Sequence, residues 1–198
     1  MIGICNIGIS NISSICKMLE KIDCPFKIIN FKSDYHSVEK IIIPGVGSFD
    51  EGMKGLAKKG LIEPLLTPEN KKILGICLGM QLLCRKSEEG KLPGLGLIKA
   101  DVIKFNISGN SIKIPHMGWN TVDVKNDNPL ISPGNNSRFY FVHSYHAVCD
   151  KKENVFLTTN YGYDFVSGIR DENIYGVQFH PEKSHRYGIH LLKNFAEL

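Results

Sequence analysis

The sequence predicts an α/β fold: a single domain with a central, mostly parallel sheet flanked by helices and an antiparallel C-terminal extension. Ile-rich runs alternate with helical segments in the first half, which is typical of a parallel sheet buried on both faces. From about Leu95 the segments are strand-like and are separated by polar turns. No linker or repeat divides the 198 residues, so we expect one domain over residues 1–198.

The first half supplies the parallel strands and the helices between them. Helix 11–22 is indicated by apolar residues at helical spacing behind Ser10, a possible N-cap. A further helix is expected at 50–59, and another begins near Leu78. The strands are expected at residues 2–8, 27–31, 40–44 and 72–77.

The second half is expected to add antiparallel strands that rejoin the main sheet, followed by a closing helix. The final segment, residues 184–198, has the apolar spacing of an amphipathic helix. The strand-like segments are residues 95–105, 111–122, 138–149, 155–162, 165–170 and 174–180.

Composition excludes several classes of protein. The net charge of +4 is weak and its basic residues are scattered, so we expect no nucleic-acid partner. No window approaches the roughly 18 apolar residues of a membrane span, and the N-terminus lacks a basic leader. We therefore expect a cytoplasmic protein without membrane contact.

The six cysteines are expected to be reduced, because the chain shows no signal peptide and no CxxC pair. Cys5 and Cys149 fall in strand-like runs, while Cys16 and Cys84 fall in helical patterns. A buried small residue explains each of these four. Cys77 has different surroundings and needs a separate interpretation.

Cys77 lies between Gly75 and Gly79, where a predicted strand meets a predicted helix. This G-x-C-x-G pattern is typical of a nucleophile elbow, in which close backbone packing requires glycines around the nucleophile. The helix N-terminus would favour the thiolate, and the amide of Leu78 could donate to an oxyanion. A buried structural cysteine would explain the same five residues about as well.

His180 and Glu182 supply the base and the orienting carboxylate that a catalytic thiolate needs. Residues two apart in an extended segment share a face, and the intervening Pro181 indicates a strand end. A surface ion pair is the alternative interpretation. A metal site is disfavoured because the spacing matches no known zinc pair, although five side chains could be grouped as one: His143, His146, His180, Glu182 and His185.

A Gly-rich turn at 44–53 follows the third predicted strand. It lacks the GK[ST] and GxGxxG patterns, so a phosphate-binding loop is disfavoured. We expect the backbone amides around Val46 and Gly47 to supply a second oxyanion donor, since glycine lets a peptide plane reorient.

Together these segments give the chain a resemblance to class I glutamine amidotransferases, the triad type, along nearly its whole length. Within that family it is most similar to the glutaminase subunits of imidazole glycerol phosphate synthases. The resemblance implies the fold expected above. The motifs that carry it are PGVG (44–47), GICLGMQLL (75–83), PHMGWN (115–120), YFVHSY (140–145) and GVQFHPEKS (176–184).

The resemblance implies that Cys77 attacks the side-chain amide of glutamine, that His180 protonates the departing ammonia, and that water then releases glutamate. Glu182 would orient His180. No cofactor or metal is implied. The residues that would grip glutamine are Gln81, Glu89, Ser144 and Tyr145, although each also has a structural explanation as a helix contact, a solvated carboxylate or a core residue.

The resemblance also implies a partner, a cyclase of (β/α)8 barrel type that forms a heterodimer with the glutaminase and uses its ammonia in histidine biosynthesis. The residues that match the docking face and ammonia passage are Asn11, Trp119, Asn120, Tyr140 and Lys183.

Two departures keep other acceptors open. Residues 6–11 differ from the Asp-Tyr-Gly type opening of the family. Residues 144–149 and the ending at 183–195 also resemble paralogues that supply ammonia for amidation of bacterial surface sugars. Alternatives from other classes are a non-catalytic homologue and a stand-alone cysteine hydrolase. High turnover without a partner would favour the last of these.

Overall fold

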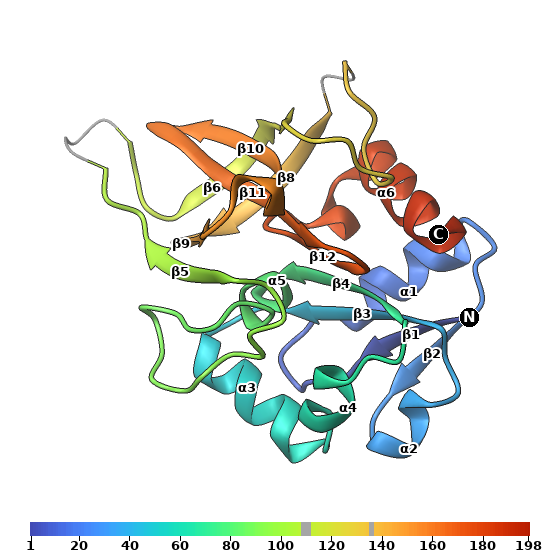
Figure 1. Ribbon diagram of the computed structural model, residues 1–198. Helices are drawn as coiled ribbons and strands as arrows, with labels where there is room; N and C mark the ends of the chain where they lie inside the picture. The colour runs from blue at the N-terminus through green and yellow to red at the C-terminus, as the bar shows by residue number, and fades with distance from the viewer. Residues whose placement is uncertain (108–111, 135–136) are drawn as a thin grey trace.

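The computed structural model describes residues 1–107, 112–134 and 137–198 (Figure 1). Within them a ten-stranded sheet follows the order β2-β1-β3-β4-β12-β11-β10-β7, with β9 paired to β11 and β5 paired to β9. A separate two-stranded sheet joins β6 and β8. The predicted fold class, a mostly parallel central sheet with an antiparallel extension, is confirmed.

The parallel part of the sheet runs from β2 to β12. Its first strand ends earlier than the predicted 2–8, because the side-chain amide of Asn6 donates to Asn30 at 2.9 Å and Gly8 takes a φ of 85°. All the carboxyl ends of these strands meet at one edge. The strands are β1 (Ile2–Cys5), β2 (Phe26–Ile29), β3 (Lys40–Gly45), β4 (Lys72–Cys77) and β12 (Ile174–Val177).

Helices cover both faces of this parallel part. Alternate side chains of β3 point to opposite faces, so Ile41 and Ile43 join the core under α3 while Ile42 joins the core under α1 and α6. Figure 1 shows α3 and α4 below the sheet and α1 and α6 above it. The helices are α1 (Ile12–Glu20), α2 (Lys32–Tyr35), α3 (Phe49–Lys58), α4 (Ile62–Leu66), α5 (Leu78–Leu82) and α6 (His185–Glu197).

The antiparallel extension differs from expectation in its boundaries. The expected strand 111–122 begins only at His116, and Ser111 lies outside the described residues. The expected strand 138–149 is split at Ser144 into two strands of different sheets. The strands are β5 (Ala100–Lys104), β6 (His116–Thr121), β7 (Asp123–Val124), β8 (Arg138–His143), β9 (Tyr145–Cys149), β10 (Val155–Tyr161) and β11 (Tyr163–Asp171), with the 3₁₀ turns η1 (Lys152–Asn154) and η2 (Pro181–Lys183).

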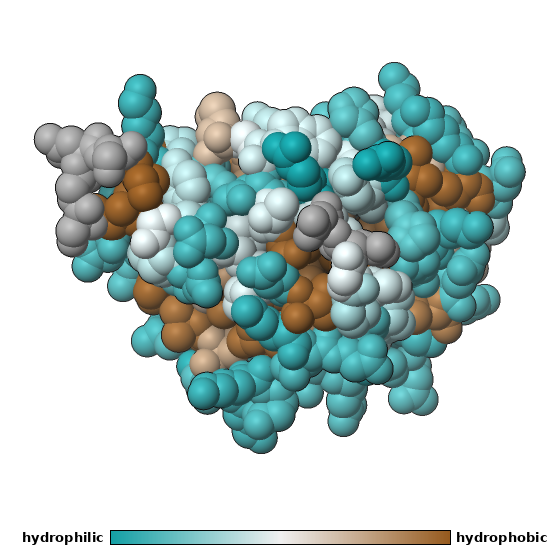
Figure 2. All heavy atoms as spheres, turned by 90° about the horizontal axis from the view of Figure 1, so that it is seen from above, coloured by the Kyte–Doolittle hydropathy of each residue, from teal (hydrophilic) through white to brown (hydrophobic). Residues whose placement is uncertain are grey.

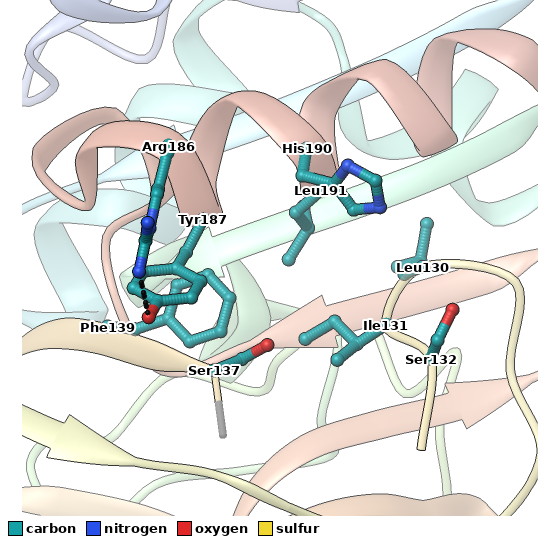
Figure 3. Close-up of a pocket in the computed structure, with 9 residues that line it drawn as sticks. All are labelled: Leu130, Ile131, Ser132, Ser137, Phe139, Arg186, Tyr187, His190 and Leu191. Atoms are coloured by element: carbon teal, nitrogen blue, oxygen red, sulfur yellow. Dashed lines mark hydrogen bonds between the residues drawn. The ribbon is translucent and has the colours of Figure 1, made fainter. Parts of the chain in front are cut away.

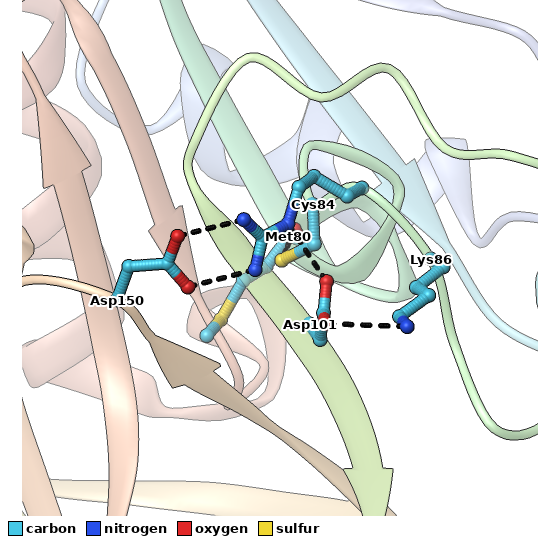
Figure 4. A network of polar contacts seen from close by, with 6 residues as sticks. Met80, Cys84, Lys86, Asp101 and Asp150 are labelled. Carbon is cyan, nitrogen blue, oxygen red and sulfur yellow. Dashed lines mark hydrogen bonds and ion pairs between the residues drawn. The ribbon is translucent and has the colours of Figure 1, made fainter.

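Arg85 ties the segment after α5 to the extension through Asp101 and Asp150, which are labelled in Figure 4. Its guanidinium contacts both oxygens of Asp150 at 2.7 Å and one oxygen of Asp101 at 2.8 Å. The helical pattern predicted around Cys84 is wrong, because α5 ends at Leu82 and the chain turns there toward this ion-pair network. All six cysteines are free.

No helix among the described residues is both long enough and apolar enough to span a bilayer.

Candidate active site

Cys77 occupies the sharp turn between β4 and α5. Its backbone has φ 54° and ψ −110°, a region that a residue with a side chain rarely adopts, and it stands at the helix N-terminus. The flanking glycines are required by contact. A Cβ on Gly75 would lie 2.6 Å from the backbone of Gly79, and a Cβ on Gly79 would overlap the carbonyl oxygen of Ile43. The sharp turn between strand and helix that the sequence predicts is present, and its backbone is strained.

His180 and Glu182 are a buried pair at the carboxyl end of β12. Nδ1 of His180 lies 2.7 Å from Oε1 of Glu182, with side-chain exposures of 1% and 4%. Burial opposes charge on the imidazole, but the sulfur of Cys77 and the carboxylate of Glu182 outweigh it and raise the pKa of His180. Nε2 of His180 is buried and has no hydrogen-bond partner among the described residues, which leaves it available on the side of Cys77.

A cavity of about 220 Å³ brings most of the predicted site residues together. Glu182 lies behind His180 and does not line it. The cavity walls come from the ends of β3, β4 and β8, from α5 and the segment after it, from the start of β9 and from the segment after β12. They are formed by Val46, Gly47, Cys77, Leu78, Gln81, Glu89, Val142, His143, Ser144, Tyr145 and His180.

The two expected oxyanion donors differ in their state. Leu78 is the first residue of α5, so its amide has no acceptor within the helix. The amide of Val46 donates to the carbonyl of Ile9 at 2.8 Å and is therefore occupied in this structure. Gly47 has a φ of 109°, which only glycine adopts easily. Rotation of one peptide plane would change the conformation of this loop.

Two of the expected glutamine contacts have structural partners as well. One carboxylate oxygen of Glu89 accepts from the amide of Phe49 at 2.8 Å, at the start of α3. The side-chain amide of Gln81 donates to the carbonyl of Tyr145 at 3.4 Å and to Oε1 of Gln178 at 3.1 Å.

Gln178 is a site residue that the sequence reasoning missed. Its side chain is fully buried, and Nε2 donates to the sulfur of Cys77 at 3.7 Å. The signal was available, because Gln178 stands two residues before His180 in the segment 174–180 that was expected to be a strand, and residues two apart in a strand share a face.

The residues expected at a docking face lie near this cavity. Trp119 stacks on His185 with ring centroids 5.5 Å apart and meets Tyr140 edge-on. Nζ of Lys183 lies 5.5 Å from the ring centroid of Tyr140. Asn11 precedes α1, which packs against η2.

A second cavity, of about 410 Å³, lies between α6 and the segment before β8 (Figure 3). It contains no residue predicted for the site. The interaction drawn in it joins Arg186 to the hydroxyl of Tyr187 at 3.0 Å, and the described residues include no hydrogen bond from a serine hydroxyl there to His190. Across the described part of the chain, no group of three or more His, Cys, Asp or Glu side chains could hold a metal ion.

The sequence comparisons with known proteins agree on the family of this chain. The family model for class I glutamine amidotransferases matches residues 4–198. The chain is 49% identical to a protein of Methanococcus maripaludis named imidazole glycerol phosphate synthase subunit HisH 2, covering 100% of this chain and 99% of that protein. It is 43% identical to the HisH 2 protein of Pseudomonas aeruginosa, covering 100% of both.

Solved structures share the fold at lower sequence identity. PurLQS from Thermotoga maritima is 22% identical with a TM-score of 0.71, covering 99% of this chain and 97% of that chain. A glutamine amidotransferase from the same organism is 19% identical with a TM-score of 0.63, covering 99% and 80%. At this identity the likeness concerns the arrangement of the elements alone.

Proposed function

This chain belongs to the class I glutamine amidotransferases, enzymes with a cysteine nucleophile, and on that premise we propose that it is the glutaminase subunit of an imidazole glycerol phosphate synthase. In this proposal residues 1–198 form a single amidotransferase domain, and the protein works in the cytoplasm. The observation that carries it is a strained Cys77 in one cavity with His180, whose imidazole is held by Glu182.

Glutamine would be cleaved first at its side-chain amide. The Cys77 thiolate attacks the amide carbon, and the carbonyl oxygen becomes an oxyanion stabilised by the amide of Leu78. The imidazolium of His180 gives its Nε2 proton to the leaving nitrogen. The C–N bond then breaks, ammonia departs, and a glutamyl thioester remains on Cys77.

Water would complete the cycle. His180, now neutral, takes a proton from water as the oxygen attacks the thioester carbon. The C–S bond breaks, glutamate leaves and the thiolate is restored beside the imidazolium. Glu182 keeps Nδ1–H of His180 directed away from the sulfur throughout, so the same nitrogen serves both steps.

The pocket residues would hold glutamine for this attack. In this proposal the second oxygen of Glu89 accepts a hydrogen bond from the substrate ammonium, and Ser144 and Tyr145, which line the same cavity, contact the substrate as well. The amide of Val46 would join Leu78 and Gly47 at the oxyanion only after its bond to Ile9 is released. This requirement would keep the isolated protein slow and let a partner switch it on.

Ammonia needs a protected path, because in water near neutral pH it is largely protonated and no longer a nucleophile. We therefore propose that a (β/α)8 barrel cyclase docks over Asn11, Trp119, Asn120, Tyr140 and Lys183 to form a heterodimer. Met117 and Trp119 of β6 are 61% and 40% exposed, which suits contact with a protein. Figure 2 views the molecule from above and shows apolar residues as separate patches among hydrophilic ones.

A second ammonia acceptor is proposed as the alternative because two related subunits occur in one organism. The chain is 49% identical to HisH 2 of M. maripaludis and 44% identical to HisH 1 of the same organism. Where two such subunits coexist, one could serve another ammonia acceptor. Amidation of a bacterial surface sugar is therefore the alternative function.

The test is to mix the chain with the cyclase of its own organism and measure glutamine-dependent turnover of the ribulosyl aminoimidazole substrate. Cys77→Ala should lower this turnover by at least ~10³-fold while ammonium salts still support the cyclase. Cys84→Ala is the matched control, because Cys84 is also buried but does not line the cavity. No glutamine-driven turnover with the unmodified pair would favour the sugar pathway, and full activity of Cys77→Ala would contradict the proposed nucleophile.

A further inference from the structure

The backbone carbonyl of Tyr145 is a branch point of buried hydrogen bonds. It accepts from Nδ1 of His143 at 2.8 Å and from Nε2 of Gln81 at 3.4 Å. A carbonyl oxygen can only accept, so it fixes which atom of each neighbour carries hydrogen toward it. The orientation of every group beyond those neighbours follows from this one acceptor.

The first branch leads to the nucleophile. Because the NH₂ group of Gln81 faces Tyr145, the same nitrogen supplies the hydrogen that Oε1 of Gln178 accepts at 3.1 Å. The Gln178 amide is thereby oriented with its own NH₂ toward Cys77, 3.7 Å from the sulfur. A flipped Gln178 would place a carbonyl oxygen against the sulfur and repel a thiolate.

The second branch leads to the surface. His143 gives its Nδ1 proton to Tyr145 and is neutral, since burial lowers its pKa to about 3, so its Nε2 must accept. The donor is Nδ1 of His116, 3.0 Å away. Nε2 of His116 then accepts from the side-chain amide of Asn120 at 3.3 Å.

Asn120 and His116 lie on the inner face of β6, which pairs with β8 so that His116 is opposite His143. The alternate residues Met117 and Trp119 point outward and are exposed. One short strand therefore carries the end of the hydrogen-bond network on one face and an exposed apolar surface on the other.

We propose that Gln178 is a positioning residue that donates a hydrogen bond to the Cys77 sulfur, and that the branched network at the Tyr145 carbonyl fixes this orientation and connects the sulfur to β6. This inference rests on the proposed role of Cys77 as nucleophile. An N–H donor stabilises a thiolate more than a thiol, so Gln178 favours the reactive form at the elbow.

The reactivity of Cys77 toward iodoacetamide, followed by mass spectrometry of its peptide as a function of pH, measures this effect without glutamine. The ionisable groups that face the sulfur are His180 from the segment after β12, and Glu89, His143 and Tyr145 from the cavity walls. None of these is changed in a variant at position 178, so a shift in the midpoint reports the lost donor.

Gln178→Met keeps the shape of the side chain but removes the donor. We expect it to raise the midpoint of alkylation by about one pH unit, the effect of one charge-assisted hydrogen bond. Gln178→Glu presents only acceptor oxygens to the sulfur, and we expect a larger rise, roughly two units. A role in packing alone would not order the two variants in this way.

Ser167→Ala is the matched control. Ser167 is fully buried on the neighbouring strand β11 and bonds Thr159 at 2.9 Å, outside the network, so its removal should leave the midpoint unchanged. The proposal would be overturned if the midpoints for Gln178→Met and Gln178→Glu lay within a few tenths of a pH unit of the midpoint for the unmodified protein. Glutaminase activity in Cys77→Ala would instead overturn the proposed nucleophile, so the two failures are distinguishable.

The far branch is tested with His143→Phe, which fits the aromatic surroundings of that position but breaks both of its hydrogen bonds. Asn120→Ala tests the same branch at a half-buried position where folding is less at risk. Both should raise the midpoint in the same direction as Gln178→Met by a smaller amount. An unchanged midpoint in folded variants of both would overturn the connection to β6.

Discussion

His180 and His143 line the same cavity, and both are buried, but their surroundings give them opposite charge states. The sulfur of Cys77 and the carboxylate of Glu182 raise the pKa of His180 against the effect of burial. Burial dominates at His143 and lowers its pKa to about 3, because its hydrogen-bond partners are a carbonyl and a neutral imidazole. The cavity therefore holds one imidazolium, His180, beside Cys77 and Glu182. It also holds one neutral imidazole, His143, which begins a neutral region of buried histidines.

The difference in charge separates a histidine that can take part in the reaction from one that has a structural role. A charged histidine beside a nucleophile can transfer a proton, whereas a neutral histidine with both nitrogens engaged can only fix the positions of its partners. His116 and His146 extend the neutral region, and burial lowers the pKa of each, to about 4 for His116. Removing a hydrogen-bond partner should thus lower catalysis at His180 and stability at the neutral histidines.

The largest effect is expected for Glu182→Gln. The amide cannot stabilise the imidazolium as the carboxylate does, and it can hold the ring in the wrong tautomer, so we expect kcat for glutamine hydrolysis to fall by ~10³- to 10⁴-fold. Steady-state kinetics in the presence of the proposed cyclase partner measure this fall. Glu88→Gln is the control, since Glu88 bonds the backbone of Lys104 outside the cavity and should keep normal activity. A Glu182→Gln enzyme with normal kcat would remove the distinction between the two histidines.

The neutral, buried histidines should lower the free energy of unfolding at acid pH. A histidine with a folded pKa well below its unfolded value contributes stability that is complete above about pH 6.5 and is lost as the pH falls toward the folded pKa. His143 and His116, with folded pKa values of about 3 and 4, should each lower the free energy of unfolding by about 1.4 kcal/mol per pH unit below pH 6. Urea unfolding at a series of pH values measures the slope.

His143→Phe should make this slope shallower by one histidine's share, because phenylalanine takes up no proton in the unfolded chain. His190→Gln, at an exposed position on α6, should leave the slope as it is. Equal slopes in all three proteins would mean that His143 is not a neutral, buried histidine.

The pairing of His180 with Glu182 was predicted from the sequence and the pairing of His143 with His116 was not, and the difference lies in how far apart the partners are. His180 and Glu182 are two residues apart, so a local pattern is enough to pair them, although Glu182 stands in the 3₁₀ turn η2 and not in the extended segment that was expected. His143 and His116 are 27 residues apart and meet only because of the β6–β8 register. Gln178 and Gln81, 97 residues apart, meet for a similar reason, the pairing of β12 with β4.

The same reasoning applies to the fold. β3 and β4 were predicted closely because each is a buried run whose hydrophobicity alone identifies it. In the extension the boundaries depend on partners instead. The expected strand 138–149 divides at Ser144 because its two halves pair with β6 and β5, partners that the segment's own sequence does not identify.

The smallest effect is expected at His146, where one hydrogen bond can be removed cleanly. Nδ1 of His146 faces the carbonyl of Ala147 at 3.1 Å and so carries the proton, which leaves Nε2 to accept from the hydroxyl of Tyr163 at 2.8 Å. Tyr163→Phe should lower the free energy of unfolding by about 1 kcal/mol at pH 8. Tyr161→Phe, which removes an exposed bond to the carbonyl of Lys113, should cost less. Glutaminase activity should be unchanged in both, since neither hydroxyl reaches the cavity; a large fall in kcat for Tyr163→Phe would show that the neutral region takes part in the chemistry after all.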